Sequence, residues 1–197
     1  MKKQFALAMA LAFAAFTTSA FAALKPGDKA PMFSAPASLD GHAFHFSLEQ
    51  ALKKGPVVVY FYPSAFTGGC DLEAHTFATE KSKFTAAGAT IIGVSQDSMG
   101  RLKQFSADPK FCAGQFPVAS NPSASIGKEY GVTVYPMMKG AKDVRGVAID
   151  HGFFARTTFV INKEGKIVAE FSSQADHLTP PEHVQRALAI VRKLDHK

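Results

Sequence analysis

The apolar positions of the chain alternate between two spacings, which predicts alternating strands and helices. Residues 57–62 (VVVYFY) form a continuous β-branched and aromatic run, as is typical of a strand covered on both faces, and Pro63 ends it. A helix is predicted from Cys70 to about Ala87, because Ala74, Phe77, Lys81 and Phe84 recur every three or four residues and Gly88 follows as a stop. The pattern therefore predicts a strand, a connecting loop and a helix in succession.

The rest of the chain continues this alternation. The further predicted elements are a buried strand at 90–95, a helix at 99–106, a short strand at 116–119, a hairpin of strands at 157–162 and 167–171, and a closing helix at 180–194. Residues 131–152 are irregular and resemble an inserted loop. No specific function is assigned to 134–148, whose stretch YPMM at 135–138 is either a surface binding patch or packed cover. This order predicts an α/β fold with a central mixed β-sheet flanked by helices, and it resembles the thioredoxin-like folds.

The first residues predict a targeting segment. A basic start is followed by an apolar stretch at 5–16 and then by Ala-Phe-Ala at 20–22, which has the form of a cleavage site. The stretch is shorter than the roughly 20 residues that span a bilayer, so it is not a membrane anchor. We expect residues 1–22 to be a cleaved signal peptide rather than a buried helix, and 23–197 to form a single domain that is periplasmic or secreted.

Charge and cysteine content narrow the function. The formal charge is +6, and removing Lys2 and Lys3 with the signal peptide leaves +4, without a dense basic block. No nucleic-acid partner is therefore expected. The chain has two cysteines, Cys70 and Cys112. In an oxidising compartment such a pair favours a disulfide, either structural or catalytic.

The surroundings of Cys70, in the stretch FYPSAFTGGCDL, are those of a reactive thiol. At the start of a helix, free backbone N–H groups and the helix dipole favour an anion, so we expect the pKa of Cys70 to be lowered. Gly69 brings bare amides close to the sulfur, and Thr67 offers a hydroxyl to a small polar substrate. Pro63 fixes the entry of the loop and shields the sulfur from water.

The pattern Pro63-x-x-x-Thr67-x-x-Cys70 resembles the active-site motif of the peroxiredoxins, which are thiol peroxidases with a modified thioredoxin fold. The resemblance extends over most of residues 24–171. Its further landmarks are KPGDKAPMF at 25–33, the strand at 57–63, YGV at 130–132 and RTTFVI at 156–161. Within the family, the chain is most similar to the Q-type, or bacterioferritin-comigratory-protein-like, branch.

This resemblance implies a role for each residue. Cys70 would be the peroxidatic cysteine, whose thiolate attacks the O–O bond and becomes a sulfenic acid. Thr67 would hold the peroxide, and the amides of Gly69 and Cys70 would stabilise the departing oxygen. Arg156 would pair with the thiolate and orient the peroxide. Glu73 would either join these hydrogen bonds or only complement the helix dipole.

The resemblance also implies a resolving step. Many Q-type relatives carry a second cysteine five residues after the first, but here that position is His75, which we interpret as a core-edge histidine rather than a proton donor. The residue after Cys70 is Asp71, whose charge opposes thiolate formation. Cys112 is thus the candidate resolving cysteine, which would form an intramolecular disulfide with Cys70. A buried small residue, or one end of a permanent disulfide, is the alternative for Cys112.

The implied activity is reduction of hydrogen peroxide and, as a second substrate class, organic hydroperoxides. An external dithiol, expected to be an exported thioredoxin-like protein, would reduce the enzyme, which would be a monomer or a weak homodimer. No cofactor, metal or stable membrane anchor is expected. The alternatives are a thiol-disulfide exchange protein or a non-enzymatic redox or binding protein. The exchange protein is disfavoured because positions 67 and 73 are Thr and Glu, so Cys70 is not part of a Cys-x-x-Cys pair.

Overall fold

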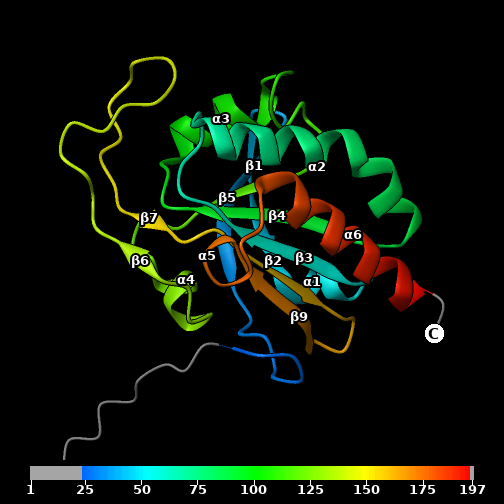
Figure 1. Ribbon diagram of the computed structural model, residues 1–197. Coiled ribbons are helices and arrows are strands. Elements are labelled where there is room, and N and C mark those ends of the chain that lie inside the picture. The colour runs from blue at the N-terminus through cyan, green and yellow to red at the C-terminus, as the bar shows by residue number, and fades with distance from the viewer. Residues whose placement is uncertain (1–23, 196–197) are drawn as a thin grey trace, which may run out of the picture.

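A seven-stranded mixed sheet forms the centre of the molecule in the computed structural model, which describes residues 24–195 (Figure 1). The predicted signal peptide lies outside these residues. In chain order the elements are β1 (Ser34–Leu39), β2 (His42–Ser47), α1 (Leu48–Leu52), β3 (Val57–Phe61), α2 (Gly68–Ala86), β4 (Thr90–Ser95), α3 (Met99–Ala107), β5 (Val118–Ser120), α4 (Ser125–Glu129), β6 (Val134–Tyr135), β7 (Phe153–Phe154), β8 (Thr157–Ile161), β9 (Ile167–Ser172), α5 (Ser173–Asp176) and α6 (Pro180–Asp195). The predicted mixed sheet flanked by helices is confirmed.

The strand order is β2-β1-β5-β4-β3-β8-β9. Strands β3, β4 and β5 run parallel at the centre, whereas β8 is antiparallel to β3 and β1 is antiparallel to β5. Every residue of β3 is buried, and successive side chains enter opposite faces: Val58 and Tyr60 join one core cluster, and Val59 and Phe61 join the other. This explains the unbroken apolar run, because a strand covered on both faces has no polar side.

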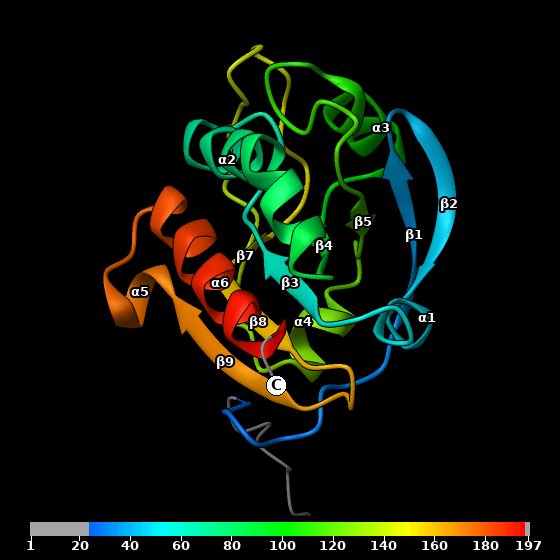
Figure 2. The same cartoon turned by 90° about the vertical axis from the view of Figure 1, so that its right-hand side faces the viewer.

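Helices cover both faces of the sheet. Phe77 of α2, Phe105 of α3 and Val184 of α6 lie in one cluster, and Leu48 of α1 and Ile126 of α4 lie in the other. Figure 2 shows α2 and α6 side by side over the same face, in agreement with their direct contact. Among residues 24–195, no helix is long and apolar enough to cross a bilayer.

Helix α2 begins two residues earlier than predicted. Thr67 is its N-cap residue with an extended backbone, and the Asp71 N–H makes the first helical bond to the Thr67 carbonyl at 2.8 Å. The predicted apolar positions Ala74 and Phe77 are buried, whereas Lys81 is only half-buried. Gly88 follows the helix with a φ of 66°, as expected of a helix stop that requires the left-handed region.

Several elements were not predicted. The hairpin of β1 and β2 was missed because β1, SAPASL, consists mainly of small residues and a proline and has no β-branched residue. Helices α1, α4 and α5 have five, five and four residues, too few for a helical period to stand out. The predicted strands and long helices were correct to within two residues at each end.

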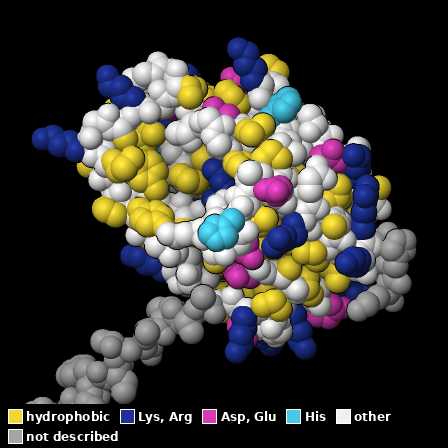
Figure 3. Space-filling model, viewed as in Figure 1, with side chains coloured by type: hydrophobic (Ala, Val, Ile, Leu, Met, Phe, Trp, Pro, Cys, Tyr) yellow, Lys and Arg dark blue, Asp and Glu magenta, His cyan; other side chains and the backbone are white. Residues whose placement is uncertain are grey.

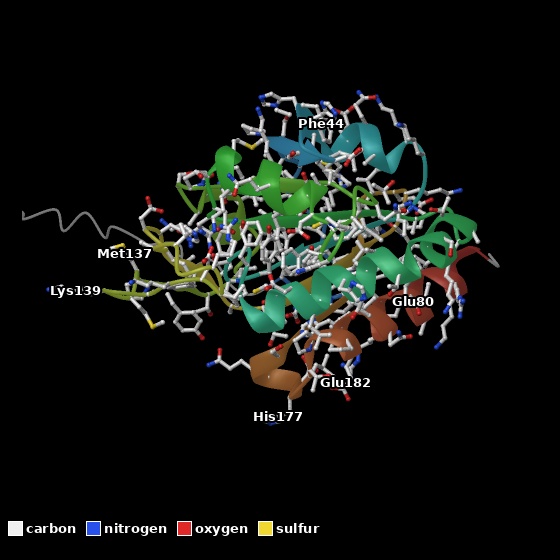
Figure 4. All side chains as sticks on the ribbon, turned by 90° about the horizontal axis from the view of Figure 1, so that it is seen from above. Phe44, Glu80, Met137, Lys139, His177 and Glu182 are labelled. Atoms are coloured by element: carbon white, nitrogen blue, oxygen red, sulfur yellow. The ribbon has the colours of Figure 1, made fainter. Side chains whose placement is uncertain are left out.

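The predicted insertion is a loop held at its base by the two-stranded ribbon of β6 and β7. Figure 1 shows it as a long yellow segment that reaches away from the sheet. Met137 and Met138 are 55% and 63% exposed, so this part of the loop is not packed cover. Figure 4 places Met137 and Lys139 at its outer end, and Figure 3 shows apolar and basic side chains together on this face.

Candidate active site

Three segments meet at one edge of the sheet because of strand direction. Strands β3 and β4 are parallel, so the loops that follow them leave the same edge. Strand β8 runs the opposite way beside β3, with Thr157 opposite Phe61, so the residue that precedes β8 returns to that edge. That residue is Arg156. The topology thus brings a residue from late in the chain beside the loop that carries Cys70.

Cys70 lies in the first turn of α2 and is 2% exposed. The N–H groups of this turn have no helical acceptors, and two of them belong to Gly69 and Cys70. A Cβ atom on Gly69 would lie 3.3 Å from Nη2 of Arg156, so only a glycine leaves the guanidinium this approach without a shift. The helix start therefore presents the sulfur, bare amides and a cation together.

The Arg156 guanidinium joins two acidic groups of α2. Its Nη2 donates to the Cys70 sulfur at 3.3 Å, and its Nη1 donates to a carboxylate oxygen of Glu73. Glu73 is fully buried. The predicted proximity of Arg156 to Cys70 is found. Glu73 lies beyond the first turn of α2 and takes part in the hydrogen bonds of the site.

Burial dominates the electrostatics of the thiol. It raises the pKa of Cys70 above its ordinary value, and the strongest opposing effect is the charge of Arg156, followed by hydrogen bonds from the Thr67 side chain and the Ser64 backbone. The expectation of a lowered pKa was therefore wrong, because it counted the helix end and ignored the removal of the thiol from water. The cation and donors around Cys70 act to make a costly thiolate attainable.

Glu73 competes with the thiolate for the same cation. Burial raises the pKa of Glu73 to about 7, although Arg156 acts to lower it. Burial also opposes the charge of Arg156, but Glu73 and Cys70 raise its pKa, so the guanidinium stays charged. Near neutral pH, one permanent cation thus faces two groups that can each become an anion.

The Thr67 hydroxyl is oriented by the loop. It donates to the Ser64 carbonyl at 2.7 Å, which uses its only hydrogen. In this orientation the lone pairs of its oxygen can accept a hydrogen bond from a substrate. A hydroperoxide has an O–H group to donate, so this orientation suits the peroxide-binding role that the sequence predicted for Thr67. Pro63 is half-buried two residues after the end of β3, where the chain leaves the sheet.

Comparisons with known proteins decide the family. The AhpC/TSA family model matches residues 26–170. The chain belongs to the AhpC/TSA, or peroxiredoxin, family. The chloroplastic peroxiredoxin Q of Oryza sativa subsp. japonica is 32% identical over 168 residues, which cover 85% of this chain and 67% of that protein. The chloroplastic peroxiredoxin Q of Sedum lineare is 30% identical over 176 residues, or 89% of this chain and 82% of that protein.

Solved peroxiredoxin structures agree. Peroxidoxin BcpB from Mycobacterium tuberculosis superposes with a TM-score of 0.69 and 27% identity, covering 86% of this chain and 97% of that chain. The bacterioferritin comigratory protein of Xanthomonas campestris gives a TM-score of 0.62 and 27% identity over 81% of this chain and 91% of its own. The thioredoxin-like fold is confirmed. This peroxiredoxin is a thiol-dependent peroxidase, and a peroxide is its substrate.

The second cysteine of this peroxiredoxin is a buried free thiol, as Cys70 is, so the two do not form a permanent disulfide in this structure. Cys112 lies between α3 and β5, where the sequence placed it, and in the same core cluster as Cys70. Burial, and then the charges of Asp71 and Asp108, raise the pKa of Cys112 well above its ordinary value. Asp71 thus acts on the second thiol of the peroxiredoxin, and Cys112 is protonated at neutral pH.

His75 is exposed on α2 and is not the core-edge histidine that was expected. The structure also reveals residues that the sequence analysis missed. They form a polar cluster behind the loop of Thr67, with a buried centre and with Arg145 at its exposed rim: Ser64, Asp97, Arg101, Asp143, Arg145 and His151. A usable signal was present, because Asp97 lies two residues after a strand predicted to be buried. A polar residue at that point lies at the end of the sheet where the active loop leaves it.

Proposed function

We propose that this peroxiredoxin uses Cys70 as its peroxidatic cysteine and Cys112 as its resolving cysteine. The observation that carries the first assignment is the 3.3 Å contact between the Arg156 guanidinium and the sulfur in the first turn of α2. A thiolate there has a cation, helix amides and the Thr67 hydroxyl around it. This is the set of groups needed to bind a hydroperoxide and to stabilise the oxygen that leaves.

In the first step, the Cys70 thiolate attacks one peroxide oxygen. An S–O bond forms, the O–O bond breaks, and the second oxygen leaves with a proton as water or an alcohol. The sulfur gives up two electrons and becomes a sulfenic acid, and the peroxide is reduced by the same two electrons. Hydrogen peroxide is the proposed substrate, with organic hydroperoxides as a second class. Arg156 and the amides of Gly69 and Cys70 would hold the developing negative charge.

In the second step, the Cys112 thiol attacks the Cys70 sulfenic acid, which gives a disulfide and water. An external dithiol, for which we propose an exported thioredoxin-like protein, then reduces the disulfide. Support for this pairing comes from the loops themselves: Phe66, before Cys70, meets Phe111, before Cys112, with ring centroids 5.4 Å apart.

The backbone conformation next to Cys112 favours local unfolding of its turn. Ala113 has a φ of 50°, in the left-handed region that costs a residue with a Cβ atom about 1 kcal/mol, so unfolding this turn releases strain. Cys70 sits in the first helical turn, where a helix frays most readily. We propose that both turns unwind locally to let the sulfurs meet.

The peroxidatic role is tested with peroxide and free-thiol titration. The wild-type protein should consume peroxide with loss of Cys70 thiol, and Cys70→Ser should consume none beyond the uncatalysed rate. If Cys70→Ser consumes peroxide as fast as wild type, the assignment fails.

The resolving role has a separate test. After one equivalent of peroxide, intact mass should fall by about two hydrogens and a peptide should link Cys70 to Cys112, whereas Cys112→Ser should stop at the sulfenic acid. A sulfenic acid that persists in the wild-type protein would assign resolution to an outside thiol.

We further propose that the protein is exported, on the strength of the sequence of residues 1–22. Expression of the full chain in a Gram-negative host and N-terminal sequencing of the periplasmic fraction should give a chain that begins at Ala23. An uncleaved chain retained in the cytoplasm would contradict export.

A further inference from the structure

The loop that carries Thr67 is held from behind by a buried carboxylate. Asp97 is 0% exposed and accepts from the Ser64 hydroxyl at 3.0 Å and the Ala65 N–H at 2.8 Å. Ser64 is in turn the residue whose carbonyl accepts from the Thr67 hydroxyl. Asp97 therefore fixes the residue that sets the direction of the Thr67 hydroxyl.

Two cations fix Asp97 itself. The Arg101 Nε lies 2.8 Å and the His151 Nε2 lies 2.9 Å from the same oxygen of Asp97. The other ring nitrogen of His151, Nδ1, lies 2.7 Å from the Gly152 carbonyl. Because both ring nitrogens face acceptors, only the doubly protonated imidazolium satisfies both contacts. Burial opposes this charge, but Asp97 outweighs it and raises the pKa of His151.

His151 comes from the end of the inserted loop, and the same loop reaches the active loop at a second point. Asp143, which is 6% exposed, contacts Arg101 at 2.9 Å and Arg145 at 2.7 Å. The Arg145 guanidinium carbon lies 3.3 Å from the centre of the Phe66 ring, and the Val144 N–H donates to the Phe66 carbonyl at 3.0 Å. Phe66 itself has a φ of 59°, a conformation that needs support from its surroundings.

We propose that residues 143–151 clamp the loop that carries Thr67, and that Asp97 is the positioning residue through which the clamp acts. The part of the inserted segment nearest the active site thereby receives a function: it holds the peroxide-binding loop in its reactive shape. This inference rests on the proposed role of Thr67 in binding the peroxide.

Arg145→Ala tests the clamp with little risk to the fold, because Arg145 lies at the surface. Arg186→Ala is the matched control: Arg186 also contacts an aspartate, Asp176 at 3.5 Å, and lies over a ring, Phe171 at 5.4 Å, but on α6 outside the clamp. Asp97→Asn, which keeps the shape of the side chain, removes the charge at the centre of the cluster.

The rate constant of Cys70 with hydrogen peroxide should fall roughly tenfold in Arg145→Ala and further in Asp97→Asn, because a misplaced binding group weakens the reactive geometry. Alkylation of Cys70 by iodoacetamide needs the thiolate but no peroxide-binding group. It loses only the share of thiolate stabilisation that the Thr67 side chain supplies, so its rate should fall much less than the peroxide rate in Arg145→Ala. Hydrogen exchange at the amides of residues 64–69 should be faster in Arg145→Ala than in Arg186→Ala, with or without peroxide. If Asp97→Asn does not fold, Arg145→Ala decides the result.

Equal exchange and equal peroxide rates in Arg145→Ala and Arg186→Ala would overturn the clamp. A parallel fall of the peroxide and iodoacetamide rates would also overturn it, since the variant would then act on the thiol and not on substrate positioning. Absence of peroxide reaction in the wild-type protein would instead defeat the proposed function, which keeps the two failures distinguishable.

Discussion

Replacing Arg156 by glutamine tests whether one buried cation makes the thiolate attainable. The guanidinium lies 3.3 Å from the Cys70 sulfur, and at an effective dielectric constant of about 20 this separation corresponds to roughly 5 kcal/mol of attraction for the thiolate. Arg156→Gln removes this attraction. Part of the loss is offset, because Glu73 without its cation takes up a proton and no longer repels the thiolate. We expect a net loss of about 3 kcal/mol, which lowers the rate constant with peroxide roughly hundredfold at pH 7.

The assay is the second-order reaction of reduced protein with hydrogen peroxide, followed by stopped-flow mixing. Alkylation of Cys70 by iodoacetamide as a function of pH reports the thiolate separately, and its midpoint should move to higher pH in Arg156→Gln. Arg186→Gln makes the same chemical change at a side chain that is 46% exposed, and it should leave both reactions within about twofold of wild type.

A peroxide rate constant in Arg156→Gln equal to that of Arg186→Gln would refute the reasoning. A slow peroxide reaction with an unchanged alkylation midpoint would refute it in part. Arg156 would then orient the peroxide without stabilising the thiolate.

Three further predictions follow from the geometry. Glu73→Gln should lower the pH midpoint of Cys70 alkylation, since an anion is removed from beside the thiolate. It should still slow the peroxide reaction, since the Arg156 guanidinium loses the partner that positions it. A rise in both rates would contradict this positioning role of Glu73. Gly69→Ala should slow the peroxide reaction severalfold, because its Cβ would lie 3.3 Å from Nη2 of Arg156, whereas Gly68→Ala, with open space around it, should not. Burial lowers the pKa of His183 to about 4 from 6.5, so its stabilising effect is complete above pH 6.5 and is lost as the pH falls toward 4. In urea unfolding, the free energy of unfolding of the wild-type protein should fall by at most about 3 kcal/mol from this histidine between pH 6.5 and pH 4, and this contribution should be absent in His183→Asn. Equal pH dependence of the two proteins would contradict the prediction.

The sequence was sufficient for those parts of the fold that have a strong local period. Strand β3 buries every one of its side chains, and α2 buries Phe77 and Phe84 at helical spacing, so their patterns can be seen in the sequence. Strand β1 and the short helices depend on neighbours from elsewhere in the chain, and their own residues carry little signal. Local propensity could not have identified them, since tertiary contacts decide their structure.

The active site divides in the same way. Thr67, Gly69 and Cys70 lie within one turn of the chain, so the motif that contains them could be recognised without a structure. The charge balance around the thiol could not be predicted in this way. It depends on how deeply the thiol is buried and on a carboxylate and a guanidinium 83 positions apart in the sequence. The wrong sign for the pKa of Cys70 came from this gap: the helix start is a local feature, whereas burial is a property of the packed core.

The same charge balance connects the thiol to its own oxidation. While Cys70 is a neutral thiol, Arg156 can pair fully with the Glu73 carboxylate. When the thiolate forms, two anions share one cation, and the pKa of Glu73 of about 7 lets that carboxylate take up a proton near neutral pH. Conversion of the thiolate to a neutral sulfenic acid would remove one anion again, so that Arg156 pairs fully with Glu73. The attraction between Arg156 and the sulfur, which helps to hold the first turn of α2, would then weaken. In the proposed resolution by Cys112, this release comes at the point where the first turn of α2 would unwind, so oxidation itself would favour the conformation that the proposed step requires.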